Sequence, residues 1–132
     1  MPRTYTVEEA NAALPEVRQL VDRIVELAPT LPEMEEQVKL EKLKSEKAGT
    51  EEARETLAQA SAQLRSAEMS VAVAIQRLEA MDINIKGPLN RGLVDFFSYR
   101  DGELVELCWQ LGEPAVEHWH RIGEGYPGRK KL

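Results

Sequence analysis

The sequence holds a single cysteine, Cys108, among its 132 residues. One cysteine excludes an intramolecular disulfide and a metal cage built from cysteine alone. Basic residues are also scarce, because 17 Lys and Arg stand against 23 Asp and Glu, giving a net charge of −6. Non-specific binding to nucleic acid needs a basic surface, so we expect no nucleic-acid partner.

Long apolar runs are missing too. No stretch approaches the roughly 20 apolar residues that cross a bilayer, so we expect no membrane-spanning segment. The first residues, from Met1 to Thr6, contain no apolar core of a signal peptide, and we therefore expect a cytoplasmic protein. Charged residues make up 30% and apolar residues 42% of the chain, the balance of a folded globular protein.

Glycine and aromatic residues are few, and nearly all of them follow Met81. Seven of the eight glycines and six of the seven aromatic residues fall in residues 82–132. Residues 1–81 are accordingly predicted to be helical, and residues 82–132 to form strands and turns. Since each part is small, we interpret residues 1–132 as one α+β domain.

Apolar residues at seven-residue intervals indicate long helices in the first part. Thr6 and Glu9 match a capping box, which predicts a short helix to Leu14 before Pro15 begins the next helix. The heptad pattern then continues on both sides of a turn at Gly49, as in helices packed along a seam. Its rows are Val17, Ile24, Leu31 and Val38; Leu20, Leu27 and Met34; Leu57, Leu64, Val71 and Leu78; and Ala60, Ala67, Ala74 and Met81.

These helices are predicted to form a long antiparallel, coiled-coil-like hairpin with its tip near residues 47–51. Gly49 suits the left-handed end of a helix, and Thr50 suits the N-cap of the next one. A short connection between two helices of this kind implies that they run antiparallel. The open end of the hairpin should bring residues 6–15 close to Met81 and to the aromatic part of the chain.

Two prolines interrupt the first long helix. Pro29 and Pro32 predict a break or kink, because proline in a helix interior removes a hydrogen bond and clashes with the preceding turn. Thr30 and Glu33 match a second capping box, from which the helix restarts. The heptad stays in phase across the break, so we expect the two pieces to be nearly collinear.

The apolar residues of the seam are buried either within the chain or against another molecule. Leu40 and Leu43 lie off the main seam, and the hairpin is long for so small a domain. We therefore expect a homodimer, or a protein partner that binds the helical hairpin.

The second part shows the two-residue alternation of strands. Ile83 and Ile85 flank a polar residue, and Asp101-Gly102 separates two alternating runs, which predicts a β-hairpin with a fixed register. One face of the hairpin should be apolar and cover the helices. It pairs Val94 with Trp109, Phe96 with Leu107, and Ser98 with Val105. The other face pairs Leu93 with Gln110, Asp95 with Cys108, Phe97 with Glu106, and Tyr99 with Leu104.

Residues 115–122 are ambiguous between helix and strand. Pro114 and Gly123 stand where residues that begin and end a helix are common. Between them, however, apolar and polar residues alternate as in a strand. We favour a third antiparallel strand. Residues 123–128 are predicted to be a loop, and residues 129–131 a basic, solvated end.

One set of residues has the chemistry of a metal site. Cys, His and carboxylate side chains bind zinc, and His is common in iron sites. If residues 115–122 form a strand, both histidines point to the same side as the Asp–Cys pair; a helix there would separate them. The predicted ligands are Asp95, Cys108, His118 and His120, with Glu106 or Glu113 as hydrogen-bonding supports.

Simpler interpretations stay open for these residues. Cys108 is either a small core residue or a nucleophile with His118 or His120 as its base. The stretch from Gly125 to Lys131 binds an anion through its backbone, or is only a solvated tail. Asp95 also fits a residue that caps a turn or pairs with an arginine, and the histidines fit surface or hydrogen-bonded positions.

Motifs distributed along nearly the whole chain resemble one family. They are Thr6-Val7-Glu8-Glu9-Ala10-Asn11-Ala12-Ala13-Leu14-Pro15, Gly92-Leu93-Val94-Asp95-Phe96, Leu107-Cys108-Trp109-Gln110-Leu111-Gly112-Glu113-Pro114, Trp119-His120 and Gly125-Tyr126-Pro127-Gly128-Arg129. The sequence is similar to the bacterial proteins grouped as domain of unknown function 2203. The resemblance implies a small, cytoplasmic, bacterial protein, and it assigns no activity or catalytic residue.

Two functions follow from the sequence. The first is a non-catalytic interaction or assembly module built on the helical hairpin. The second is a zinc- or iron-dependent protein, enzymatic or not, that uses the cluster of predicted ligands. The first needs exposed apolar residues on the helices, whereas the second needs a histidine within bonding distance of Cys108 or Asp95.

Overall fold

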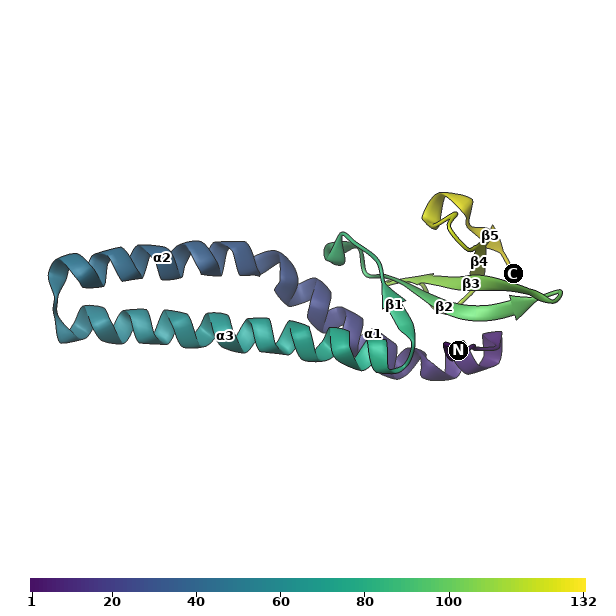
Figure 1. The fold of residues 1–132 in the computed structure, drawn as a ribbon, viewed down its shortest axis with the longest axis horizontal. Coiled ribbons are helices and arrows are strands. Elements are labelled where there is room, and N and C mark those ends of the chain that lie inside the picture. Colours follow the sequence, from purple (N-terminus) through teal and green to yellow (C-terminus); the bar gives the residue numbers. More distant parts are fainter.

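A computed structural model describes residues 1–132 and shows an α+β protein with long N-terminal helices followed by a five-stranded antiparallel sheet (Figure 1). The helices are α1 (Val7–Leu27), α2 (Leu31–Ala48) and α3 (Glu51–Ala80), with a short 3-10 turn at Ala28–Thr30. None of them combines the length and apolar character needed to cross a membrane.

Capping explains where the helices begin. The Thr6 side chain accepts a hydrogen bond from the backbone of Glu9, and the Glu9 carboxylate accepts one from the backbone of Thr6, so the first predicted capping box is confirmed. The hydrogen bond that the Glu9 carboxylate accepts from the Thr6 backbone is the main cause that lowers the pKa of Glu9. Thr50 caps α3 through the backbone of Ala53, after Gly49 ends α2 in the left-handed conformation.

Three helix predictions are wrong. Helix α1 continues through Pro15, because buried Leu14 and Val17 pack into the core and outweigh the roughly 3 kcal/mol cost of an internal proline. The interruption near Pro29 is present, but α2 runs at an angle to α1 rather than collinear with it (Figure 1). Thr30 does not cap α2, since its hydroxyl donates to the Leu27 carbonyl instead.

The sheet lies at one end of the molecule, and α2 and α3 extend side by side away from it (Figure 1). Its strands are β1 (Ile83–Ile85), β2 (Leu93–Arg100), β3 (Glu103–Gln110), β4 (His118–Arg121) and β5 (Lys130–Lys131). Each strand pairs with its neighbour in the chain. The predicted β2–β3 register is confirmed at every pair, and the ambiguous segment does contain a strand.

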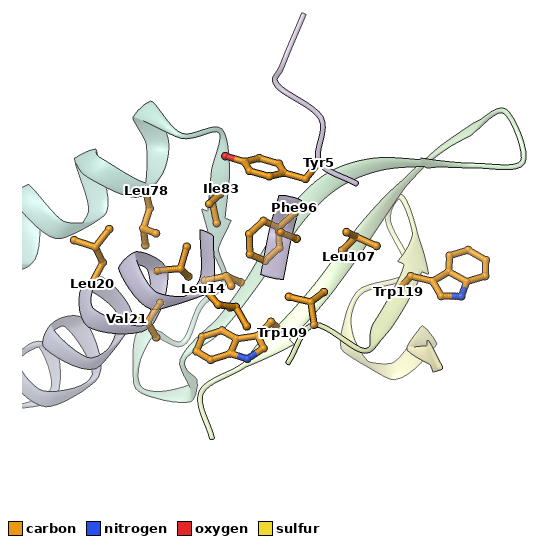
Figure 2. Packing of buried hydrophobic residues seen from close by; sticks show 14 of the residues in the cluster. Tyr5, Leu14, Leu20, Val21, Leu78, Ile83, Phe96, Leu107, Trp109 and Trp119 are labelled. Carbon is orange, nitrogen blue, oxygen red and sulfur yellow. The ribbon is translucent and has the colours of Figure 1, made fainter. Parts of the chain in front are cut away.

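The core lies between α1, the end of α3 and one face of the sheet (Figure 2). Trp109 and Phe96 are fully buried there, as the predicted apolar face requires. Tyr5 fastens the N-terminus to this core: its ring meets Phe96 edge-on at 5.3 Å, and its hydroxyl donates to the Met81 carbonyl. The helices therefore cover one face of the sheet and leave the other face for polar side chains.

The C-terminal end is not the solvated tail that its basic composition suggests. β5 pairs with β4, and Arg129 is largely buried, with its Nη2 2.6 Å from Glu113 Oε1. The last residues thus add an edge strand to the sheet.

Candidate metal centre

Antiparallel pairing brings polar residues from three strands to one face of the sheet. Asp95 on β2 lies opposite Cys108 on β3, which lies opposite His118 on β4. Two residues further along β4, His120 lies opposite Glu106. Because side chains alternate between faces with period two, all five point away from the helices.

Three of these residues form a buried cluster. The ligand-type atoms of Asp95, Cys108 and His120 all lie within 4.8 Å of one another. The three residues are 1%, 0% and 1% exposed, respectively. The shortest contact joins His120 Nε2 and Asp95 Oδ1 at 3.1 Å. Three of the four predicted ligands are thus brought together.

The backbone fixes the hydrogen positions of His120. Its Nδ1 lies 2.9 Å from the carbonyl oxygen of Arg121, and a carbonyl can only accept a hydrogen bond. Nδ1 therefore carries a hydrogen, and Nε2 is the atom left to share a proton, or a cation, with Asp95. Histidines that bind metals are commonly oriented in this way by a backbone carbonyl.

Cys108 is a poor nucleophile in this setting. Burial and the nearby Asp95 carboxylate raise the pKa of its thiol to about 12. A reactive cysteine needs the opposite shift, because the thiolate is the attacking species. These surroundings therefore favour the neutral thiol, which can donate a hydrogen bond. Because the thiolate is also the form that ligates metals, a cation bound here would have to displace the thiol proton.

Two further charged residues, Lys86 and Glu106, lie beside the cluster. Lys86 Nζ lies 3.5 Å from Asp95 Oδ2 and 3.9 Å from Glu106 Oε2. Burial and the proximity of Asp95 raise the pKa of Glu106. Glu106 therefore stands beside the cluster, as the sequence suggested. Lys86 was missed, although the alternation through Ile83 and Ile85 would have placed it on this face.

His118 does not join the cluster. Its Nδ1 lies 3.1 Å from Arg129 Nη2 and 3.6 Å from Glu113 Oε2. Arg129 also donates to the Cys108 carbonyl, so this second group fastens the C-terminal end to β3. Three of the four residues predicted as ligands therefore converge, and Glu113 contacts Arg129 at the chain end rather than the cluster.

A cavity of about 290 Å³ opens beside the cluster. Asp95, Glu106 and His120 line it, together with residues from the 123–127 loop that follows β4. The remaining lining residues are Lys86, Gly87, Arg91, Leu93, Gly123, Gly125, Tyr126 and Pro127. Two members of the cluster are therefore reachable from a polar cavity in spite of their burial.

The family model described as "Uncharacterized conserved protein (DUF2203)" matches residues 3–132. No curated protein and no solved structure matches the chain. The match covers essentially the whole sequence, in agreement with the spread of the motifs along it.

Proposed function

The chain belongs to the DUF2203 family of uncharacterized conserved proteins, and from the geometry of its sheet we propose that it binds a divalent metal ion. The ligands are Asp95, Cys108 and His120. Zinc is the first candidate, since this set of oxygen, sulfur and nitrogen donors suits it, and iron is the second. The observation that carries the proposal is the convergence of three buried donors of the correct types.

The spacing of the donors supports this proposal. Two ligand atoms bound to one tetrahedral Zn²⁺ at about 2.0 to 2.2 Å lie roughly 3.3 to 3.6 Å apart. The 3.1 Å between His120 Nε2 and Asp95 Oδ1 needs only a few tenths of an ångström of adjustment. One carboxylate and one thiolate would also balance the charge of a divalent ion.

The ligand count bears on what the ion would do. Structural zinc sites are closed by four protein ligands, whereas catalytic sites keep one position for water or substrate. Three protein ligands leave such a position, and the adjoining cavity gives it space. A metal here would act on a bound molecule rather than only stabilise the fold.

Metal content tests the proposal directly. Untagged protein purified without chelator is expected to hold about one zinc or iron per chain, measured by elemental analysis. His120→Ala and Cys108→Ala should each lose most of it, because each removes a ligand. His118→Ala is the matched control: it removes a histidine two positions away that contacts Arg129 and Glu113, so its metal content should stay at the wild-type level.

Cobalt substitution separates ligation from unfolding. Co²⁺ in a site with a thiolate ligand gives a near-ultraviolet charge-transfer band that Cys108→Ser should abolish while circular dichroism shows intact helices. The proposal is wrong if the wild-type protein takes up no zinc, iron or cobalt when they are supplied. It is equally wrong if the folded His120→Ala variant retains its metal.

A second function is favoured by the exposed apolar residues of α2. Leu40 is 45% and Leu43 58% exposed, although both are leucines in the middle of a helix. A shallow hollow lined by Pro32, Glu33, Glu36, Gln37 and Leu40 lies on the same helix. We infer that α2 and α3 act as a coiled-coil-like hairpin that pairs with a second copy of the chain.

Sedimentation equilibrium tests this pairing. The wild-type protein is expected to be a dimer at micromolar concentration, and the double variant Leu40→Gln, Leu43→Gln a monomer, because it removes the apolar area that would be buried between copies. Met69→Gln on α3 is the control, since Met69 is also exposed but lies further from the tip. A monomeric wild-type protein would exclude self-assembly through this surface.

A further inference from the structure

The cavity beside the cluster carries two cations as well as the proposed ligands. Lys86 and Arg91 both line it, together with Asp95 and His120. Only two of its eleven lining residues are hydrophobic, so its polarity does not suit an apolar molecule. Its volume of about 290 Å³ restricts it to a small ligand.

Arg91 is the cation of this cavity without a carboxylate partner. Its guanidinium lies over the Tyr126 ring at 4.9 Å, while Arg129 lies over the same ring at 4.8 Å. Tyr126 thus contacts two arginines, of which only Arg129 is paired with a carboxylate, that of Glu113. Stacking holds a guanidinium in place and leaves its N–H groups free to bind a planar or tetrahedral oxyanion.

The ion pairing of Lys86 depends on what Asp95 binds. Without a cation in the cluster, Lys86 is shared between Asp95 and Glu106. A metal ion bound by Asp95, Cys108 and His120 would take over the Asp95 carboxylate. Lys86 would then be opposed by Glu106 alone, and the cavity would hold two cations against one carboxylate.

We infer that this cavity binds the carboxylate or phosphate group of a small molecule, between the metal ion on one side and Lys86 and Arg91 on the other. The inference rests on the proposed metal site, because the anionic group of the small molecule would bind the metal ion at its open coordination position. Arginine fits either oxyanion through paired hydrogen bonds, so the shared chemistry is that of an anionic oxygen group.

Anion titrations of the cobalt-loaded protein test the inference. Inorganic phosphate and succinate are added separately, and the visible cobalt spectrum reports a ligand that enters the open position. At least one of them is expected to change the spectrum saturably. Arg91→Gln should weaken that binding about ten-fold or more, because it removes a charge-assisted pair of hydrogen bonds.

Two controls keep the result specific. Arg65→Gln removes the same charge from the middle of α3, outside the cavity. It should leave the dissociation constant within about two-fold of the wild-type value, because salt screens a distant surface charge. Lys86→Gln should weaken anion binding without loss of cobalt, because Lys86 is not a ligand. Loss of cobalt from Lys86→Gln would contradict this division of roles.

The outcomes separate the two proposals. If cobalt binds but neither anion changes its spectrum, the inference is wrong and the metal site stands. If no metal binds, calorimetry of the metal-free protein with the same anions decides. If the metal-free protein binds an anion and Arg91→Gln weakens that binding, the anion site is supported without the metal site. If the metal-free protein binds neither anion, both the anion site and the metal site are wrong.

Discussion

Trp109→Ala is expected to destabilise the protein by about 3 to 5 kcal/mol, the cost of removing a large aromatic side chain from a packed core. Trp109 is fully buried against α1, in the neighbourhood of Leu14 and Val21 (Figure 2). Its indole Nε1 also donates to the Glu113 carbonyl. The substitution therefore leaves a cavity in the core. It also leaves the carbonyl of Glu113, the residue that pairs with Arg129, without its indole donor.

Urea unfolding followed by circular dichroism measures this loss. Tyr99→Ala is the control, because Tyr99 is an aromatic residue on the adjacent strand but is 55% exposed. Its truncation should cost roughly 0.5 to 1 kcal/mol, as expected of a largely exposed position. Similar losses in the two variants would contradict the placement of the core on the Trp109 face of the sheet.

Gly92→Ala is expected to cost about 2 to 5 kcal/mol. Gly92 has a φ of +63°, which costs a residue with a Cβ roughly 1 to 2 kcal/mol. A Cβ here would also lie 2.7 Å from Leu111 Cβ and 3.2 Å from Val25 Cγ2. Overpacking of this kind adds about 1 to 3 kcal/mol, since both neighbours are held by the core.

Gly49→Ala isolates the backbone part of that cost, so the difference between the two variants gives the steric part. Gly49 has nearly the same φ, +61°, but no atom lies within 4 Å of a Cβ built on it. Thermal unfolding should therefore show a loss of only about 1 to 2 kcal/mol for Gly49→Ala. If both alanine variants lose the same stability, the close approach of β2 to α1 and Leu111 is not what requires glycine at position 92.

The parts of the fold that follow local rules were predictable from the sequence. The two-residue turn at Asp101-Gly102 determined the β2–β3 register, and through it the opposition of Asp95 and Cys108. The capping residues Thr6 and Thr50 marked helix starts, because a side-chain oxygen there accepts a backbone hydrogen bond. The alternation in residues 115–122 placed both histidines on the correct face.

The remaining features depend on contacts between distant residues. The basic composition of the last residues suggested a solvated end, but Glu113 supplies a partner that only the folded sheet brings near Arg129. His118 contacts the same arginine, whereas His120 contacts Asp95, so spacing alone could not tell which histidine meets Asp95. Pro15 predicted the start of a new helix, whereas α1 continues through it. Packing of its neighbours in the core outweighs the local preference of proline for a helix start.

The order of the strands has a consequence for how the cluster assembles. Each strand pairs with its neighbour in the chain, and His120 lies only 25 positions after Asp95. Bringing the three donors together therefore closes short loops, whose entropic cost is small and grows only slowly with length. The contacts within the sheet are of low contact order, which favours rapid pairing. None of the donors comes from α2 or α3, so a lengthened or shortened turn at Gly49 would leave the chemistry of the sheet untouched.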